Sequence, residues 1–197
     1  ARLLASVAAI TAVLTLHGIY PSWQASLLAA AFHVVSVATT TGYSSTDYAL
    51  WPVFAPVWLL FLGTFVSCAG STGCGIKMVR MVLLIKQARR ELVRAIHPRV
   101  VNPVIMGGAT IAPKVIASVM AYMLIYGATT VALTMLMLLS GLDMVTAVTA
   151  VVATVNNIGP GLGNVGPSSN FGVLSDFQTW ICTVGMMMGR LELPAVM

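Results

Sequence analysis

Apolar segments of two lengths alternate with short polar loops along most of the chain. Arg2–Ile19 and Lys114–Ser140 are close to the length of about 20 residues with which a helix crosses a bilayer about 30 Å thick. Two further apolar segments, Gln24–Ala38 and Asp143–Val155, are shorter. At a rise of about 1.5 Å per residue, each spans about 22 Å or less. These two segments therefore predict helices that enter a membrane and return without crossing it.

Each short segment ends in a loop that carries glycine. Glycine reaches backbone angles that other residues avoid, so such a loop can turn carbonyl oxygens inward toward an ion. The C-terminus of a re-entrant helix carries about half a negative charge, which favours a cation. Aligning the loops on their glycines predicts two matched filter segments: Thr40, Thr41, Gly42 and Tyr43 in the first loop, and Asn157, Ile158, Gly159 and Pro160 in the second.

The remaining segments complete an order that is given twice. Val53–Ser67 is apolar and meets a small, polar stretch at Cys68–Gly75, after which Ile76–Ala95 resumes as a basic amphipathic helix. Pro98–Pro113 predicts a connection, and Phe177–Met197 predicts a last apolar helix. Both halves read as span, half-length helix, loop and span, which indicates internal duplication.

The amino-acid composition indicates that this helical protein is a membrane protein. The chain is 58% hydrophobic and 8% charged, with a mean hydropathy of +0.95, whereas soluble domains carry roughly 25% charged residues. We therefore predict an all-α integral membrane protein with two repeats of transmembrane helix, re-entrant pore helix, filter loop and transmembrane helix. The first repeat covers residues 1–95, the connection residues 96–113 and the second repeat residues 114–197. Cys68, Cys74 and Cys182 lack the spacing of a metal site and suit helix packing.

Positive charge gathers in one part of the chain. Eight of the ten Lys and Arg residues lie between Lys77 and Lys114, together with a single acid, Glu91. The positive-inside rule places residues 77–114 in the cytoplasm and the two filter loops toward the outer side. Because the basic stretch joins directly onto membrane segments, it argues against binding to nucleic acid. Anionic membrane lipid and a cytosolic partner remain equal alternatives for its basic helix.

The stretch at Cys68–Gly75 predicts an interruption at about mid-membrane depth. Its small and hydroxylated residues, which give a flexible backbone and hydroxyls that can face water, are Gly70, Ser71, Thr72, Gly73 and Gly75. Non-helical backbone at that depth is tolerated where it is buried in protein or faces water. A glycine-rich kink for helix packing is the alternative. The same string is reminiscent of an intramembrane serine protease, but no His base is placed to activate Ser71, so we predict no enzymatic activity.

Arg190 is the most costly residue to place in a membrane. If the last helix enters near Phe177, Arg190 lies about 20 Å further along, past the midplane. A charged residue at that depth faces a bundle interior or water. We predict that Arg190 faces the pore and has a functional role there. The alternatives are a snorkelling side chain or a pair with Glu192, although two residues along a helix point to different sides.

These motifs together resemble a known family. The chain is similar to the membrane subunit of bacterial Trk-type potassium transporters, in the Trk/Ktr/HKT superfamily, and within it to the TrkH/TrkG branch. The matching stretches, spread over nearly the whole chain, are Val37–Trp51, Cys68–Lys77, His97–Arg99, Asn156–Gly163 and Gly189–Leu193.

The resemblance implies a polypeptide with four span–pore–span repeats around a fourfold pseudosymmetric pore, of which this chain would hold the third and fourth. It implies potassium uptake across the bacterial inner membrane, with potassium bound by filter carbonyls and no organic cofactor. It also implies that residues 68–75 form a gating loop and that Arg190 forms an electrostatic barrier below the filter. It also implies a homodimer and a cytosolic nucleotide-binding regulatory subunit. The chain is then a fragment whose missing N-terminal repeats belong to the same polypeptide.

Three alternatives remain open at this point. The first is a sodium-permeable or sodium/potassium-transporting relative in the same superfamily, although Gly42 and Gly159 both favour potassium. The second is a secondary transporter with broken helices, which would lack two half-length helices that enter from one face. The third is a non-conducting docking subunit, whose behaviour would not depend on the filter residues.

Overall fold

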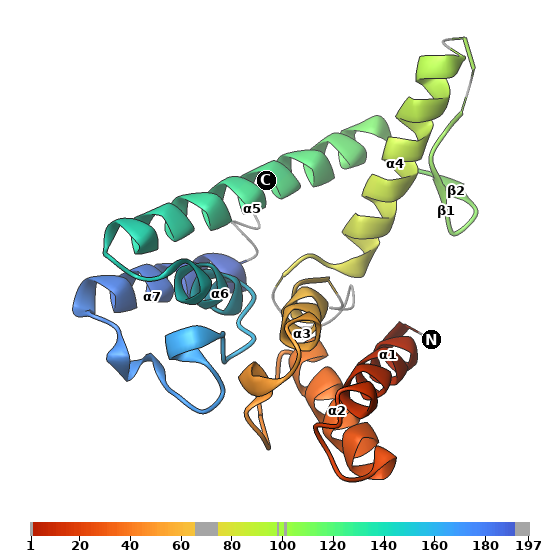
Figure 1. Ribbon diagram of the computed structural model, residues 1–197. Helices are drawn as coiled ribbons and strands as arrows, with labels where there is room; N and C mark the ends of the chain where they lie inside the picture. The colour runs from red at the N-terminus through yellow and green to blue at the C-terminus, as the bar shows by residue number, and fades with distance from the viewer. Residues whose placement is uncertain (1, 66–74, 98, 101, 192–197) are drawn as a thin grey trace.

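The computed structural model describes residues 2–65, 75–97, 99–100 and 102–191. Within these ranges the protein is built from seven α-helices, three short 3-10 turns and one small hairpin (Figure 1). The helices are α1 (Arg2–Leu16), α2 (Trp23–Ala38), α3 (Phe54–Phe65), α4 (Met78–Ile96), α5 (Pro113–Leu139), α6 (Met144–Val155) and α7 (Asp176–Arg190). The 3-10 turns are η1 (Tyr48–Leu50), η2 (Gly163–Val165) and η3 (Phe171–Val173). The predicted helical class is confirmed.

The helices form two groups of three. In the first group α2 packs against α1 and α3, and in the second α6 packs against α5 and α7. Each half-length helix thus lies against two others, and the order along the chain is the same in both groups (Figure 1). Helix α3 also contacts α6, which joins the groups. The pore helices predicted over Gln24–Ala38 and Asp143–Val155 are therefore central in their groups.

Each half of the chain also buries side chains in the core formed by the other half. Ile158 and Leu162 follow α6 in sequence, but they are buried in the hydrophobic core of the first group. Ile76, which precedes α4, is buried in the core of the second group. Burying such a side chain stabilises a fold by about 1.5–3 kcal/mol. The two halves of the chain are therefore interlocked rather than merely adjacent.

Helix α5 is distinguished from the other helices by its length. Among the helices of the described residues, only α5, with 27 residues, is long and apolar enough to cross a membrane by that measure. Helix α1 ends at Leu16 and not at Ile19 as predicted. The backbone N–H of Gly18 donates to Thr15 O at 3.1 Å, and that of Ile19 donates to Leu14 O at 3.2 Å. This is the Schellman arrangement, which ends a helix.

Capping residues define both ends of the α5–α6 connection. Gly141, with a φ of +89°, follows the C-cap of α5, as the sequence predicts. Asp143 is the N-cap of α6, and its Oδ2 accepts a hydrogen bond of 3.0 Å from the backbone N–H of Thr146. Hydrogen bonding from Thr146 lowers the pKa of the Asp143 carboxyl below its ordinary value. Both predicted caps of this turn are confirmed.

The connection at residues 96–113 contains structure that the sequence analysis did not predict. Strands β1 (Ile105–Met106) and β2 (Ala109–Thr110) pair antiparallel, and together with α4 they project away from the two helix groups (Figure 1). Gly107 and Gly108 between them have φ values of +58° and +84°, which a type I′ turn requires. A Gly-Gly pair between apolar residues was the available signal. The Lys86 ammonium ties the hairpin to α4 by donating to Ile105 O at 2.6 Å.

Helix α7 approaches α6 so closely that it has no room for a side chain at one position. A Cβ on Gly189 would overlap the backbone carbonyl of Val155 and lie 3.2 Å from the Asn157 side chain. Gly127 on α5 is the opposite case, because a Cβ there would meet nothing within 4 Å.

We predict that Gly189→Ala lowers the melting temperature of the intact polypeptide in detergent, because overpacking at a backbone contact costs about 1–3 kcal/mol. The matched control, Gly127→Ala, leaves stability unchanged or raises it by up to about 1 kcal/mol, since alanine favours a helix over glycine. Equal melting temperatures for the two variants would contradict the close packing of α7 on α6.

Candidate ion-binding site

The two half-length helices end in the same backbone motif. After α2, the N–H of Thr40 donates to Val37 O at 3.0 Å and that of Thr41 donates to Ser36 O at 2.9 Å. This pair of bonds defines a Schellman motif, in which Thr40 takes the position that usually holds glycine. The chain therefore turns sharply at the point where the first predicted filter segment begins.

The second helix repeats the motif at the aligned positions. The N–H of Asn157 donates to Thr154 O at 3.0 Å, and that of Ile158 donates to Ala153 O at 2.9 Å. Asn157 is thus the counterpart of Thr40, as the alignment on the glycines predicts. The two predicted filter segments therefore begin with the same backbone conformation.

Positive φ angles recur at matched positions in both loops. Thr40 and Gly42 have φ values of +55° and +79°, and Asn157 and Gly159 have values of +50° and +115°. In the described part of the chain, Thr40 and Asn157 are the only residues other than glycine with positive φ. Asn tolerates this region, but for a β-branched Thr it is a strained conformation, and such strain tends to persist at functional sites.

The hydrogen bonds also set the direction of the carbonyls. The N–H groups of Thr41 and Gly42 both donate to Ser36 O, at 2.9 and 3.3 Å. In a trans peptide the carbonyl points opposite to the N–H of the next residue. The carbonyls of Thr40 and Thr41 consequently point together away from the end of α2. By the same argument, the Asn157 carbonyl points away from the end of α6.

The two loops touch through their backbones. A Cβ added to Gly42 would overlap the carbonyl oxygen of Ile158, and a Cβ added to Gly159 would lie 3.2 Å from the Gly42 Cα. Only glycine fits this contact at both positions, because any larger residue would push the loops apart. Two residues 117 positions apart, 42 and 159, are therefore neighbours.

A cavity of about 390 Å³ opens beside this contact. Gly42, Gly159 and Pro160 line it, together with Ser44, Met186 and residues between 165 and 171. Tyr43 instead lines a separate cavity of about 420 Å³ against α2. Thr41 is exposed, and its hydroxyl lies 2.8 Å from that of Thr39. Gly42, Gly159 and Pro160 therefore line one cavity. The side chain of Tyr43 lines a different cavity, and that of Ile158 is buried in the core of the first group.

Polar side chains on α2 brace the first loop. The Ser36 hydroxyl donates to the Tyr43 carbonyl at 2.6 Å. His33, fully buried, places one ring nitrogen 2.7 Å from Ala29 O and accepts from the Ser45 N–H at 3.4 Å with the other. The sequence analysis assigned no role to either residue. The available signal was the spacing of the two residues, which places both on nearly the same side of an apolar helix.

The second loop is braced by threonines on α6. Thr149 Oγ1 accepts from the Leu162 N–H at 2.9 Å and lies 3.2 Å from Leu162 O, and Thr146 Oγ1 accepts from the Asn164 N–H at 3.1 Å. These contacts attach the chain beyond the second predicted filter segment to α6. The two loops thus share one helix-capping motif but differ in their braces.

The predicted gating loop is described only at its last residue. Gly70, Ser71, Thr72 and Gly73 lie outside the described residues, so their role stays a prediction. Gly75, with a φ of +96°, packs against the second loop, because a Cβ there would lie 2.6 Å from Asn156 Oδ1. The N–H of Ile76 donates to Thr64 O at 3.0 Å, whereas a continuous helix would separate residues 64 and 76 by about 18 Å.

Arg190 is the last residue of α7 and is exposed in this chain. The helix that carries it is attached to the second loop, since Asn157 Nδ2 donates to Met186 O at 3.2 Å. Gly189 adjoins the end of α6. Glu192, its alternative partner, lies outside the described residues, and the predicted barrier role of Arg190 stays a prediction.

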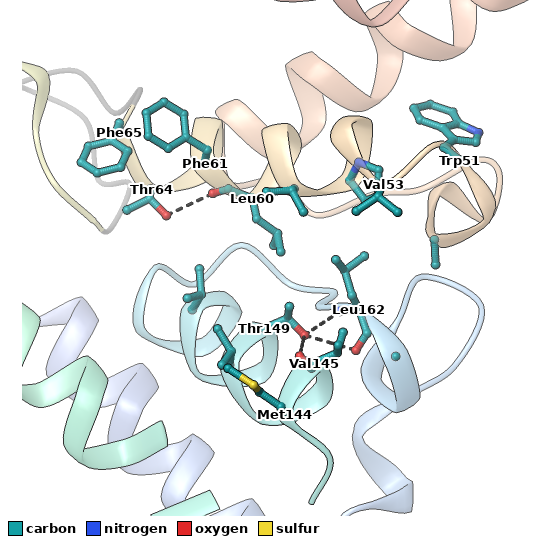
Figure 2. Close-up of a pocket in the computed structure, with 16 residues that line it drawn as sticks. Trp51, Val53, Leu60, Phe61, Thr64, Phe65, Met144, Val145, Thr149 and Leu162 are labelled. Carbon is teal, nitrogen blue, oxygen red and sulfur yellow. Dashed lines mark hydrogen bonds between the residues drawn. The ribbon is translucent and has the colours of Figure 1, made fainter. Parts of the chain in front are cut away.

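A larger cavity lies elsewhere and has the wrong chemistry for an ion. It measures about 680 Å³ and lies between α3 and α6. Figure 2 shows apolar side chains around it, including Leu60, Phe61 and Val145. The hydroxyls of Thr64 and Thr149 there already bond to neighbouring backbone groups. A cation that has lost its water needs oxygen ligands, so the contact between the loops that carry Gly42 and Gly159 is the better candidate.

Paired half-length helices whose glycine loops meet are typical of membrane proteins that conduct ions. The family described as TrkH, cation transport protein, matches residues 9–197 of the chain. The chain belongs to this family, which confirms the resemblance seen in its motifs. It is a membrane protein of a transporter family and not of an enzyme family.

Individual relatives support the same assignment. The chain is 40% identical over 177 residues to the Trk system potassium uptake protein TrkH of Vibrio parahaemolyticus, covering 90% of this chain and 36% of the relative. It is 36% identical over 162 residues to the Trk system potassium uptake protein TrkG of Escherichia coli, covering 82% of this chain and 33% of the relative. The chain thus spans about a third of the length of these curated relatives.

A solved structure extends the similarity to the fold. The crystal structure of the potassium transporter TrkH from Vibrio parahaemolyticus matches with a TM-score of 0.89 and 38% sequence identity. The match covers 98% of this chain and 41% of that one. The helical architecture described above is therefore that of the corresponding part of a known transporter.

The brace on the first loop generates a prediction. Ser36→Ala removes the donor to the Tyr43 carbonyl and should speed backbone hydrogen exchange in residues 42–47 by about threefold or more, because a lost hydrogen bond costs about 1 kcal/mol. The control is Ser26→Ala on the same helix, whose buried hydroxyl bonds only to Ser22 O, at 3.4 Å, in the described part of the chain. Mass spectrometry of exchanged peptides measures both, and equal exchange in the two variants would rule out the brace.

Proposed function

We propose that the chain forms half of the pore through which a longer polypeptide takes up potassium ions. The observation that carries this proposal is the backbone contact between Gly42 and Gly159 at the ends of two identically capped helices. A potassium filter requires backbone oxygens from several loops to converge on one axis. The names of the relatives, which are potassium uptake proteins, support the choice of ion.

The mechanism proposed here is dehydration of the ion by filter carbonyls. Those of Thr40, Thr41 and Asn157 are directed away from their helices, which is the orientation that replacing hydration water requires. The C-terminal ends of α2 and α6 add partial negative charge, which favours a cation. A membrane potential contributes about 2.3 kcal/mol per charge per 100 mV, and this drives inward movement through an open path.

The rest of the pore belongs to segments that this chain does not contain. Two span–pore–span repeats enclose only part of a ring, so we propose that two further repeats of the same polypeptide complete a fourfold pseudosymmetric pore. In this arrangement the filter loops lie toward the outer side of a bacterial inner membrane and residues 77–114 lie in the cytoplasm. A homodimer and a cytosolic nucleotide-binding regulatory subunit belong to the same proposal.

Residues 68–75 and Arg190 are proposed to control passage below the filter. The contact of Gly75 with Asn156 supports this placement, because it puts the end of the break beside the residue that precedes the second filter segment. The attachment of α7 to Asn157 supports the placement of Arg190 near the same segment. A fixed positive charge there raises the energy of a passing cation.

We predict that Gly42→Ser or Gly159→Ser, made in the intact polypeptide, lowers the potassium-to-sodium permeability ratio by about tenfold or more. A side chain at either position separates the loops and disturbs the spacing of their carbonyls, which sets selectivity. Flux measurements in proteoliposomes with each ion give the ratio. Gly127→Ser is the matched control, since its surroundings are open.

An unchanged ratio in both filter variants would remove the filter assignment and favour a docking subunit. A wild-type protein that carries sodium as readily as potassium would favour the sodium-permeable alternative. Cysteines introduced at positions 43 and 160 that react from opposite membrane faces would favour a secondary transporter.

A second prediction concerns the charge at the end of α7. Arg190→Gln should raise potassium flux by about threefold or more while leaving the permeability ratio unchanged, because it removes a positive charge from the ion path. Arg94→Gln on the exposed face of α4 is the control for a change in net charge. A flux that is equal to or below that of the wild type would contradict the barrier.

A further inference from the structure

A cavity of about 330 Å³ opens between the basic helix α4 and the segment that leads into the β1–β2 hairpin. Its wall on α4 carries Lys86, Arg89 and Arg90, and the opposite wall is formed by residues 102–105, including Asn102. Cationic side chains and a carboxamide offer hydrogen-bond donors, and none of the described residues that line the cavity is acidic. The cavity therefore has the chemistry of an anion site.

Packing and a hydrogen bond hold the two walls of this cavity in place. Leu83 of α4, Val104 of the opposite wall and Ile116 of α5 form a small buried core. The Lys86 ammonium joins the walls directly by donating to Ile105 O at 2.6 Å. An ammonium has three donors, so this bond leaves two donors of Lys86 for an anion. The site is thus preorganised, which lowers the entropic cost of binding.

The positive charge around the cavity is only partly balanced. Glu91 is the single acid between residues 77 and 114. Its carboxylate is shared by Arg90 and Arg94, at distances of 3.3 and 3.5 Å. Arg89 is exposed, and it has neither an ion pair nor a hydrogen bond within the described part of the chain. The guanidinium of Arg89 therefore remains for an anion that comes from outside this chain.

An exposed apolar stripe runs along α4 beside the cavity. It consists of Ile85, Leu92 and Ile96, each more than half exposed, and their spacing of seven and four residues places them on one side of the helix. Arg89 borders the stripe, because it lies four residues after Ile85 and three before Leu92. Helix α4 and the hairpin also project away from the two helix groups (Figure 1). Basic side chains beside an apolar stripe are typical of a helix at a membrane surface.

We propose that the cavity binds the phosphate of an anionic phospholipid headgroup through Arg89, while the acyl chains of the same lipid lie against Ile85 and Leu92. A phospholipid accounts for both observations, because one molecule carries an anion and apolar chains. A soluble phosphate compound would leave the stripe exposed to water. The inference goes beyond the proposed function, since it concerns α4 and the hairpin and does not depend on the filter loops.

The first test measures hydrogen exchange of the intact polypeptide in nanodiscs of phosphatidylcholine that contain an increasing fraction of phosphatidylglycerol. The anionic lipid should slow exchange in residues 102–111 by about threefold or more, because a bound headgroup ties the hairpin to α4. In Arg89→Gln, the fraction of phosphatidylglycerol that gives half of this slowing should be about fivefold higher. That is the factor expected for the loss of one basic contact at an anionic surface.

Two variants control for the change in charge. Arg94→Gln removes the same charge from the same helix, but Arg94 does not line the cavity and already pairs with Glu91. Its half-effect fraction should stay within about twofold of the wild type, and so should that of Arg89→Lys, which keeps the charge. Glycerol phosphate added to nanodiscs of phosphatidylcholine alone should have no effect. The same slowing with this soluble compound would assign the cavity to a free phosphate and overturn the lipid.

A second measurement identifies what lies against the apolar stripe. A photoreactive benzophenone amino acid replaces either Leu92 or Arg94 in the intact polypeptide, and light then links it to its neighbour in bacterial membranes. We expect a phospholipid adduct at position 92 and none at position 94, because residues two apart point to different sides of a helix. Mass spectrometry distinguishes an added lipid from an added protein.

A protein adduct at position 92 would assign the stripe to a partner and overturn the inference, and so would the absence of any adduct there. Equal exchange at every fraction of phosphatidylglycerol overturns it as well, as does an equal response of Arg89→Gln and Arg94→Gln. Neither readout uses ion flux, so these failures leave the proposed function standing. Conversely, a polypeptide that binds the lipid but does not select potassium would remove only the proposed function.

Discussion

The backbone contact between Gly42 and Gly159 is the constraint on which the rest of the arrangement depends. Two loops can approach this closely only if both lack side chains at the point of contact and both helices stop at matched positions. Neighbouring elements follow the same requirement. Gly63 on α3 leaves room for the Ile158 side chain, since a Cβ there would lie 2.5 Å from Ile158 Cδ1. The helices are thus packed around the meeting point of two loops rather than around a single apolar centre.

Much of this arrangement could be predicted from the sequence because it depends on local signals. Apolar segment lengths identified α2 and α6 as half-length helices, and the two glycines identified the loops that follow them. The cap at Thr40 could not be predicted, because a β-branched residue disfavours positive φ and the surrounding fold imposes it. The pairing of Thr64 with Asn156 was also missed, because residues 92 positions apart leave no periodic pattern in the sequence.

Side chains that each half of the chain buries in the core of the other half explain how the contact between the two loops is maintained. Ile158 places its carbonyl against Gly42 and its side chain in the core of the first group, so one residue serves both the loop contact and the packing. In the other direction, Ile76, which precedes α4, is buried in the core of the second group. Displacing either group would therefore break the contact and also expose apolar surface to water. That exposure costs about 25 cal/mol for each Å² of apolar surface. A stable core and a positioned loop are consequences of the same residues.

The two loops differ in what their helix caps contact. Thr39 and Asn156 occupy equivalent C-cap positions, yet Thr39 is exposed and bonds within its own loop and helix, whereas Asn156 is buried between α3 and α5. The first loop is braced to its own helix through Ser36 and His33. At the second loop, Asn156 contacts both Thr64 and Gly75. The two loops thus share one backbone geometry, and a difference at a single cap position links only the second loop, within the described residues, to the Thr64 side chain.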